Sequence, residues 1–273
     1  MYKLMLSDLD ETLLVKHHVP AFNVEAIKAA RKKGLKFVPA TGRAYNMIPE
    51  ILKEIDADGK AGEYSICFNG ALIVENKNDR ILNFKGISFE TTKMLFNKAK
   101  DYDVCVLIFT IDMCYIYNAD PDEVQRKTDQ KAPFVVIDEY NMDNLKDEKI
   151  AKILYEKRDM KYLKNIEKEI SEMIEGKACA SYSSNRYLEF NAIGVDKGFG
   201  LRWLANYLGI EISETIAIGD NYNYVEMIKA ASLGVCVTCA SEDIKALAQY
   251  VTIHDYDQGA VKEVIEKFVL EAE

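Results

Sequence analysis

The chain has no long apolar run, and it is poor in glycine, proline and histidine. A helix that crosses a membrane needs about 20 consecutive apolar residues, and no segment approaches that length. With 14 glycines and 5 prolines in 273 residues, long linkers and disordered segments are not expected. The three histidines, His17, His18 and His254, have neither metal-ligand spacing nor a serine or cysteine partner. We therefore expect a globular protein without histidine chemistry.

An excess of positive charge is also absent. Asp and Glu number 44 against 35 Lys and Arg, which gives a formal net charge of −9. Such a surface repels phosphate backbones and anionic lipids, so neither nucleic acid nor a membrane is expected as a partner. Asp8 and Asp10 stand where a secretion signal would have its apolar segment, so the expected location is the cytoplasm. The spacing Cys236-Val-Thr-Cys239 lacks the second pair or histidine that would complete a metal site.

Strand-like and helix-like segments alternate at both ends of the chain. Near the start, residues 2–6 predict a strand, and Asn23 predicts the cap of a helix that stops at Gly34. Further strands are predicted over residues 35–39, 64–68, 215–218 and 233–237. A helix that begins at Lys197 is predicted over residues 197–209. This alternation predicts an α/β fold with a doubly wound parallel sheet.

The middle of the chain has a different pattern. A helix is predicted over residues 89–102, a hairpin-like pair over 104–109 and 113–117, and a charged helix over 160–175. These features predict a separate α+β insertion at residues 85–184. The parallel-sheet core would then consist of residues 1–84 plus 185–273.

Two carboxylates, Asp8 and Asp10, follow the first predicted strand. Residues two apart on a strand point to the same face, so the two charges would repel each other unless a cation lay between them. Hard oxygen ligands in a compact cluster favour Mg²⁺. In a doubly wound sheet the loops after the strands converge, so Asp220 can join the pair and bind the metal together with Asp8 and the Asp10 carbonyl.

These residue types suit phosphoryl transfer. Asp8 is a candidate nucleophile that would form an aspartyl-phosphate, and Asp10 is a candidate acid and base for the leaving oxygen and for water.

Four further residues are candidates for binding the phosphoryl group. The Thr41 side chain and the N–H groups of Leu9 and Gly42 could hold the phosphoryl oxygens, and Lys197 could neutralise their charge. Each side chain also has a plain structural reading, because Thr41 could cap a helix and Lys197 could be a solvated first-turn residue. The occurrence of all of them in one chain favours the site.

Several segments, in their order along the chain, resemble the motifs of the haloacid dehalogenase superfamily, and within it the Cof-type sugar phosphatases with a C2B cap. They are Asp8-Leu9-Asp10-Glu11-Thr12-Leu13, Thr41-Gly42-Arg43, Asn69-Gly70-Ala71, Leu188-Glu189-Phe190, Gly194-Val195-Asp196-Lys197-Gly198 and Gly219-Asp220-Asn221-Tyr222-Asn223. The residue after the second aspartate is often glycine in this family, so Glu11 is a departure.

The resemblance implies a Rossmann-like core with an inserted cap and Mg²⁺-dependent hydrolysis of small phosphorylated metabolites, with sugar phosphates favoured. It also implies that the cap, residues 85–184, closes over the core and selects the substrate. Arg43 and Asn69 would line the substrate pocket, although Arg43 could instead pair with a core carboxylate and Asn69-Gly70 could be a turn.

The fourth motif departs from the family pattern. It usually continues Asn-Asp, whereas this chain has Asn223-Tyr224. The expectation is a site held by Asp8, Asp220, the Asp10 carbonyl and Asn223 with weakened Mg²⁺ binding, because loss of a supporting acid often costs about 10- to 100-fold in metal affinity. Two alternatives stay open: a catalytically impaired relative that binds a phosphorylated ligand or protein, and a phosphomutase.

Overall fold

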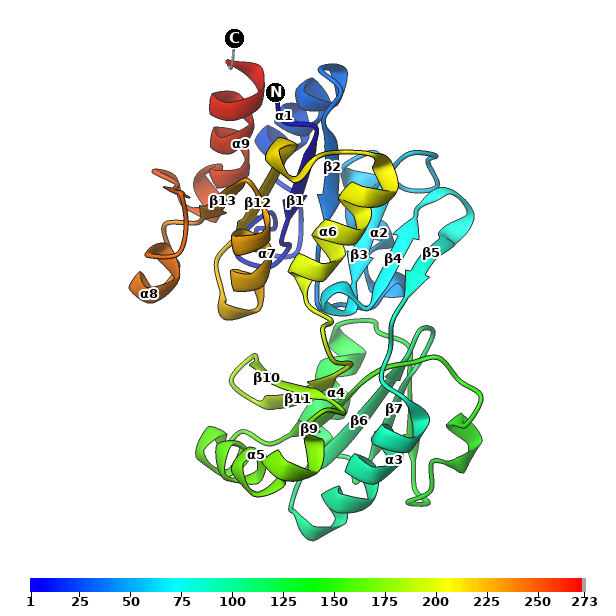
Figure 1. Cartoon of the computed structure of the whole chain (residues 1–273). Helices are drawn as coiled ribbons and strands as arrows, with labels where there is room; N and C mark the ends of the chain where they lie inside the picture. Colours follow the sequence, from blue (N-terminus) through cyan, green and yellow to red (C-terminus); the bar gives the residue numbers. More distant parts are fainter. Residues whose placement is uncertain (272–273) are drawn as a thin grey trace. The chain divides into compact units, whose positions relative to one another are not determined.

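The computed structural model describes residues 1–271, apart from the side chain of Asn223. The chain forms two compact units. The core unit contains residues 1–43, residues 48–83 and the chain from residue 196 onward. The second unit contains residues 44–47 and 84–195, and both are drawn in Figure 1.

A five-stranded parallel sheet forms the centre of the core unit, with the order β14-β13-β12-β1-β2. The strands are β1 (Leu4–Ser7), β2 (Lys36–Pro39), β12 (Thr215–Gly219), β13 (Leu233–Cys236) and β14 (Tyr250–Val251). Leu4, Met5 and Leu6 are all fully buried, as expected for a strand that is covered on both faces. This sheet confirms the predicted α/β class with a parallel core.

The register of the sheet sets the position of the loops that follow its strands. Leu6 lies opposite Ala217 of β12 on one side and Val38 of β2 on the other. The carboxyl ends of these three neighbouring strands therefore lie side by side, and so do the loops that follow them.

The helices of the core unit pack on this sheet and on each other, and Figure 1 labels them. They are α1 (Ala21–Lys32), α2 (Pro49–Glu54), α6 (Lys197–Leu208), α7 (Val225–Ala230), α8 (Glu242–Lys245) and α9 (Ala260–Ile265). Leu204 of α6 and Met227 of α7 belong to the same buried cluster as Leu6. Among the described residues, no helix has both the length and the apolar character needed to cross a membrane.

A smaller sheet with the order β3-β4-β5 completes the core unit. Its strands are β3 (Tyr64–Cys67), β4 (Leu72–Glu75) and β5 (Arg80–Phe84), and β3 pairs antiparallel with β4. Thr41 donates its N–H to the Ile66 carbonyl at 2.8 Å. The chain that follows β2 thus continues alongside β3.

The prediction that Asn23 caps the first helix is wrong. The helix begins at Ala21 after Pro20, whose φ of −58° and ψ of 143° form the extended entry. Asn23 is instead fully buried within α1. Its Nδ2 donates to the Leu13 carbonyl at 3.3 Å, and its Oδ1 accepts from the Lys262 N–H of α9 at 3.1 Å. Asn23 therefore joins α1 to α9.

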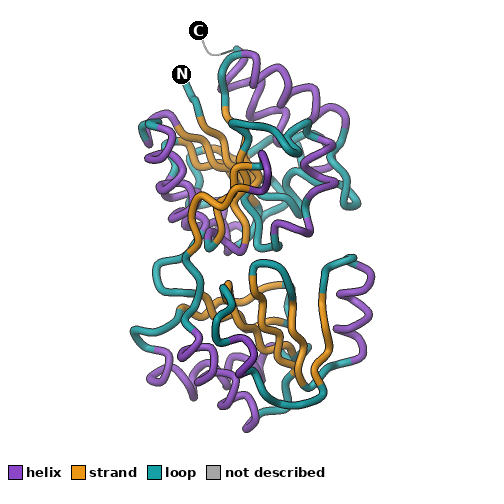
Figure 2. The backbone as a smooth tube through the Cα atoms, turned by 90° about the vertical axis from the view of Figure 1, so that its right-hand side faces the viewer, coloured by secondary structure: helices purple, strands orange, loops and turns teal. Residues whose placement is uncertain are grey.

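The second unit is built on a six-stranded sheet with the order β10-β11-β9-β6-β7-β8, seen from another side in Figure 2. All pairs are antiparallel except β7 with β8. The strands are β6 (Cys105–Thr110), β7 (Cys114–Tyr117), β8 (Phe134–Ile137), β9 (Ile150–Glu156), β10 (Cys179–Ser183) and β11 (Tyr187–Asn191).

Three α-helices belong to this unit, namely α3 (Phe89–Lys98), α4 (Pro121–Asp129) and α5 (Met160–Ile174). Phe96 of α3, Ile153 of β9 and Ile170 of α5 share one buried cluster. The helices α3 and α5 therefore supply the unit with a hydrophobic core of its own.

The boundary of the second unit differs from the predicted one. The sequence predicted the insertion to end at residue 184, but β11 pairs with β9 and β10, so the compact unit extends to residue 195. Strand pairing with distant partners decides where β11 belongs, and local periodicity carries no information about it. The role of the unit as a substrate-selecting cap stays a prediction.

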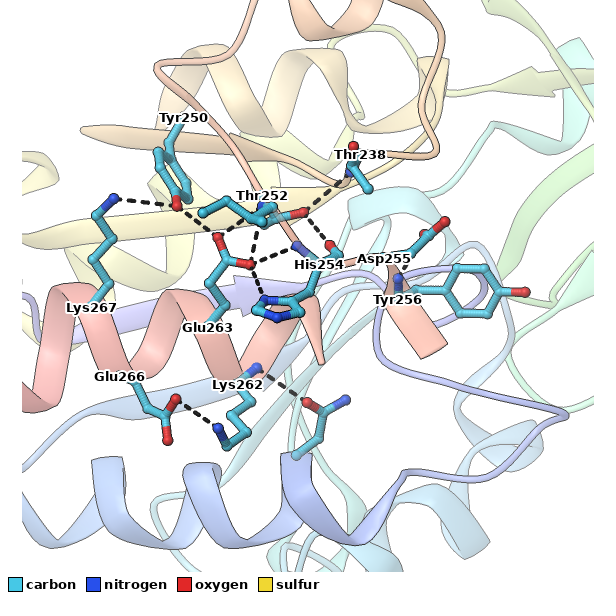
Figure 3. Close-up of polar contacts among 12 residues, drawn as sticks. Thr238, Tyr250, Thr252, His254, Asp255, Tyr256, Lys262, Glu263, Glu266 and Lys267 are labelled. Atoms are coloured by element: carbon cyan, nitrogen blue, oxygen red, sulfur yellow. Dashed lines mark hydrogen bonds and ion pairs between the residues drawn. The ribbon is translucent and has the colours of Figure 1, made fainter. Parts of the chain in front are cut away.

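Glu263 of α9 joins this helix to the segment that follows β14 (Figure 3). Its carboxylate accepts from the Tyr250 hydroxyl at 2.6 Å, from the Ile253 N–H at 3.0 Å and from the His254 N–H at 2.9 Å. The His254 Nδ1 lies 2.8 Å from the same carboxylate. Burial alone raises the pKa of Glu263, but these hydrogen bonds outweigh it and hold the pKa below its ordinary value.

We expect Glu263→Gln to lower the free energy of unfolding at pH 7 by about 1–3 kcal/mol, because the Tyr250 hydroxyl and the N–H groups of Ile253 and His254 lose a charged acceptor. A lowered folded-state pKa stabilises the protein above the unfolded pKa of about 4.3, and this stabilisation is lost as the pH falls through the folded value. The difference between wild type and variant should therefore shrink in acid. Denaturant titrations at neutral and acidic pH measure it.

Glu266→Gln is the matched control. Glu266 pairs with Lys262 at 2.8 Å on the same helical segment, but the two side chains are 41% and 42% exposed. Its loss should change the free energy of unfolding by less than about 0.5 kcal/mol. An equal difference for Glu263→Gln at neutral and acidic pH would contradict the assignment.

Candidate active site

A buried ion pair joins the end of β1 to the start of α6. Lys197 Nζ lies 2.7 Å from Asp8 Oδ1, and the two side chains are 0% and 2% exposed. Asp8 follows β1 directly, and its N–H donates to the Ile218 carbonyl at 3.0 Å. Lys197 is the first residue of α6, which begins there because the Asp196 side chain accepts from the Phe199 N–H at 2.6 Å. Asp8 and Lys197, predicted from distant parts of the sequence, thus meet.

Burial acts on both members of this pair. It raises the pKa of Asp8 above its ordinary value, although Lys197 opposes this shift. Burial also lowers the pKa of Lys197, and Asp8 opposes that shift. Each partner therefore opposes the shift that burial causes in the pKa of the other.

Asp220 extends the site from the end of β12. Its Oδ1 accepts from the Thr12 hydroxyl at 2.9 Å, and the residue is 8% exposed. Burial and the charge of Asp8 raise the pKa of Asp220 to about 7. Thr12 was not among the predicted site residues, and its only signal in the sequence is a hydroxyl four residues after Asp8 in the first motif.

Tyr224 is also part of the site, although no pocket role was predicted for it. Its ring centroid lies 3.6 Å from Lys197 Nζ, and the residue is 6% exposed. Burial and the charges of Asp8 and Asp220 raise the pKa of Tyr224 well above its ordinary value, so the phenol is neutral. A Cβ on Gly219 would lie only 2.6–2.8 Å from atoms of Tyr224, so a glycine at that position leaves the space for this side chain.

Asp10 lies at the rim of the site. Its side chain is 52% exposed, and both of its oxygens contact the Arg43 guanidinium, with Nε to Oδ2 at 3.1 Å. Arg43, predicted as a pocket residue, therefore makes the alternative contact that the sequence left open, the ion pair with a core carboxylate.

The segment around Thr41 lies beside the turn that contains Asn69. Thr41 is buried, its Oγ1 accepts from the Arg43 N–H at 3.1 Å, and its carbonyl accepts from the Asn69 N–H at 2.9 Å. Asn69 has φ of 54° and ψ of 35°, and its buried Oδ1 has no hydrogen-bond partner. Gly70 permits a close approach, since a Cβ there would lie 2.2 Å from the Asp196 carbonyl oxygen.

Three further predicted residues can be placed only in part. Leu9 is fully buried, and its carbonyl accepts from three later N–H groups, those of Thr12, Leu13 and Leu14. Gly42 approaches Asn69, whose Oδ1 would lie 3.1 Å from a Cβ on this glycine. The side chain of Asn223 lies outside the described part of the structure.

The donor set can be tested for its fit to Mg²⁺. Asp8 Oδ2 is buried and has no hydrogen bond of normal geometry, although the Tyr224 phenol lies near enough to lower the pKa of Asp8. Burial, together with the charge of the neighbouring Asp8, raises the pKa of Asp220. Within the described residues, no three His, Cys, Asp or Glu side chains form a metal cluster. Mg²⁺ is usually bound by one or two carboxylates and retains water, so the residues fit this ion.

A cavity away from these residues also lies in the core unit. It has a volume of about 320 Å³ and is lined by His254, Gln258, Gly259, Lys262, Glu263, Glu266, Lys267 and Glu271. Two of the residues that line this cavity, Lys262 and Glu266, form an ion pair. Because none of the predicted site residues lines this cavity, the chemistry is not assigned to it.

Comparison with known families supports the motif assignment. A model of the haloacid dehalogenase-like hydrolase family matches residues 5–265. The Bacillus subtilis (strain 168) protein named "Putative phosphatase YxeH" is 29% identical over 275 residues, which cover 99% of each chain. The predicted resemblance is thereby confirmed.

Two solved structures from Bacteroides thetaiotaomicron are similar over nearly the whole chain. A haloacid dehalogenase-like hydrolase has 27% identity and a TM-score of 0.85, with 98% of this chain and 99% of that chain covered. BT1666, described among the phosphatases of the same superfamily, has 26% identity and a TM-score of 0.81, with coverage of 98% and 95%.

We expect Gly219→Ala to destabilise the protein by about 1–3 kcal/mol, because the added methyl group overlaps the Tyr224 side chain. Urea titrations measure the change in the free energy of unfolding. In the Tyr224→Ala background, Gly219→Ala should cost less than in wild type, because most of the side chain that the methyl group overlaps is absent. Equal costs in the two backgrounds would show that Tyr224 does not fill the space above Gly219.

Proposed function

The chain belongs to the haloacid dehalogenase-like hydrolase family, and we propose that it is a Mg²⁺-dependent phosphatase of small phosphorylated metabolites, with sugar phosphates as the favoured class. The observation that carries the proposal is the buried contact between Asp8 and Lys197 at the carboxyl end of the parallel sheet. The names of the Bacillus subtilis relative and of BT1666 support a phosphatase. A cytoplasmic location stays a prediction from the sequence.

Asp8 is the proposed nucleophile. One of its carboxylate oxygens attacks phosphorus, the bond from phosphorus to the leaving oxygen breaks, and an aspartyl-phosphate forms. Water then attacks this phosphorus and releases inorganic phosphate and free Asp8. Burial supports the role, because a desolvated carboxylate is not shielded by a hydration shell.

Asp10 is the proposed acid and base. It would protonate the leaving oxygen in the first step and take a proton from water in the second. The Arg43 guanidinium contacts both Asp10 oxygens. The role therefore requires Arg43 to move aside when substrate binds, and a phosphoryl group is an anion that competes for it.

The proposed phosphate cradle consists of Lys197, the Thr41 hydroxyl and the N–H groups of Leu9 and Gly42. Its positive charge comes from Lys197, which neutralises charge on the phosphoryl oxygens. Asp8, Asp220 and the Asp10 carbonyl would hold Mg²⁺, which supplies further neutralisation of phosphoryl charge when it is bound.

A catalytically impaired relative that binds a phosphorylated ligand is the second candidate. The observation that favours it is the uncharged Tyr224 ring beside Asp8 and Lys197. The nucleophile, the acid-base carboxylate and the lysine are nevertheless all present, and they favour turnover.

We expect Asp8→Asn to lower phosphate release by more than about 10³-fold, because an amide cannot form the acyl phosphate. The assay measures inorganic phosphate from a panel of phosphorylated metabolites with and without Mg²⁺. Asp58→Asn, at an exposed position, serves as the control and should retain wild-type rates. Release that persists in Asp8→Asn, or that is independent of Mg²⁺ in the wild type, would contradict the proposed mechanism.

We expect Tyr224→Asp to lower the Mg²⁺ concentration needed for half-maximal activity by about tenfold, because a second acid beside Asp220 supports the metal and its water shell. Mg²⁺ titrations of phosphate release compare the variant with wild type. Tyr222→Asp is the matched control. Because Tyr222 is 63% exposed, this variant should leave the midpoint of the Mg²⁺ titration near that of wild type. An unchanged midpoint in Tyr224→Asp would remove the idea of weakened metal binding.

A further inference from the structure

The Lys197 ammonium has two partners of different chemical kinds. On one side it contacts the Asp8 carboxylate at 2.7 Å, and on the other it lies 3.6 Å from the centroid of the Tyr224 ring. The lysine side chain is completely buried, so both contacts are desolvated. A cation over an aromatic face in such a place is held more strongly than at a surface.

We propose that Tyr224 is a positioning residue for phosphoryl transfer, whose ring face holds the Lys197 ammonium against Asp8. The placement rests on the geometry alone, whereas its catalytic effect rests on the proposed phosphatase function. Tyr224 acts through Lys197 and is not itself assigned to the reacting atoms.

The ring is held in position by its backbone surroundings. Tyr224 ends a short 3₁₀ turn, Tyr222–Tyr224, in which its N–H donates to the Asn221 carbonyl at 3.0 Å. The Asn221 side chain accepts from the Tyr222 N–H at 2.8 Å and caps the same turn. Gly219 leaves space for the side chain. The ring is thus a rigid surface for the end of a flexible lysine side chain.

An aromatic ring at position 224, in place of a carboxylate, also leaves Asp8 as the carboxylate that contacts the Lys197 ammonium. A carboxylate at position 224 would compete with Asp8 for the ammonium and would add a negative charge beside Asp8 and Asp220. The ring attracts the same ammonium without a formal charge. Lys197 therefore stays directed at Asp8, where phosphoryl charge would arrive.

The first experiment tests the placement without turnover. Protons above the face of an aromatic ring resonate upfield, so the ε-methylene signal of Lys197 should be displaced in protein labelled with ¹³C-lysine. Lys197→Met assigns the signal by removing it. The displacement should persist in Tyr224→Phe, which keeps the ring, and should be lost in Tyr224→Leu. A Lys197 signal at the ordinary lysine position in wild type would overturn the proposal.

The second experiment tests the function of this contact. Tyr224→Leu should lower kcat/KM by about 30-fold, which corresponds to about 2 kcal/mol for a desolvated cation and ring, whereas Tyr224→Phe should stay within about threefold of wild type. Tyr222→Leu, an exposed neighbour of the same residue type, should keep kcat/KM near the wild-type value.

A double-mutant cycle with Lys197→Met separates positioning from a general structural effect. If Tyr224 acts through the lysine, Tyr224→Leu should cause little further loss once Lys197 is replaced. Equal losses in both backgrounds, or a loss in Tyr224→Phe as large as in Tyr224→Leu, would overturn the proposal. Thermal unfolding of each variant identifies a loss caused by misfolding, and in that case Tyr224→Met replaces Tyr224→Leu.

The outcomes distinguish this inference from the proposed function. If wild type releases no phosphate from any substrate, the proposed function fails, and the dissociation constant for inorganic phosphate with Mg²⁺ replaces kcat/KM in the same cycle. Weaker phosphate binding in Tyr224→Leu that disappears in the Lys197→Met background would then support positioning. Identical binding in wild type and Tyr224→Leu would overturn it.

Discussion

The buried ion pair between Asp8 and Lys197 is the interaction on which the arrangement of the site depends. Removing two charges from water costs several kcal/mol per ion, so such a pair persists only when its geometry is closely fixed. Lys197 also begins α6, where the helix dipole disfavours a positive charge. The parallel sheet fixes Asp8 at the end of β1, between β12 and β2, and Gly70 lets the start of α6 approach. Sheet order and helix position thus combine in one contact.

Around this pair, the carboxylates are arranged in two different ways. Asp10 at the rim is neutralised by Arg43. Asp220 in the interior accepts a hydrogen bond from the Thr12 hydroxyl, and burial together with the charge of Asp8 raises its pKa. Two carboxyl groups thus lie beside a single lysine in the interior, and a divalent cation would favour the ionised form of both. At the rim, a substrate phosphate would instead compete with Asp10 for the Arg43 guanidinium, and its binding would release Asp10 for proton transfer.

Local signals in the sequence were sufficient for much of the fold. The helix predicted over residues 197–209 begins at Lys197 and ends at Leu208, because an aspartate cap and a glycine in the left-handed region mark its two ends. Contacts between distant segments were not accessible in the same way. Nothing near β11 indicates that it pairs with β9, and nothing near Tyr224 indicates that its ring lies over Lys197, because these partners are fixed by sheet order and helix packing. The role of Asn23 could not be predicted for the same reason, because its side chain accepts a hydrogen bond from α9, far along the chain.

The replacement of an acid by Tyr224 changes two properties of the site together. A carboxylate at this position would support a cation and would also draw Lys197 away from Asp8, whereas an uncharged ring does neither. The predicted weaker support for the metal and the proposed placement of the lysine would therefore have the same origin. An apolar residue that only filled space would supply no attraction for the ammonium. The ring lies 3.6 Å from a completely buried cation, so the departure from the family motif is better explained as a different distribution of charge in a working site than as its loss.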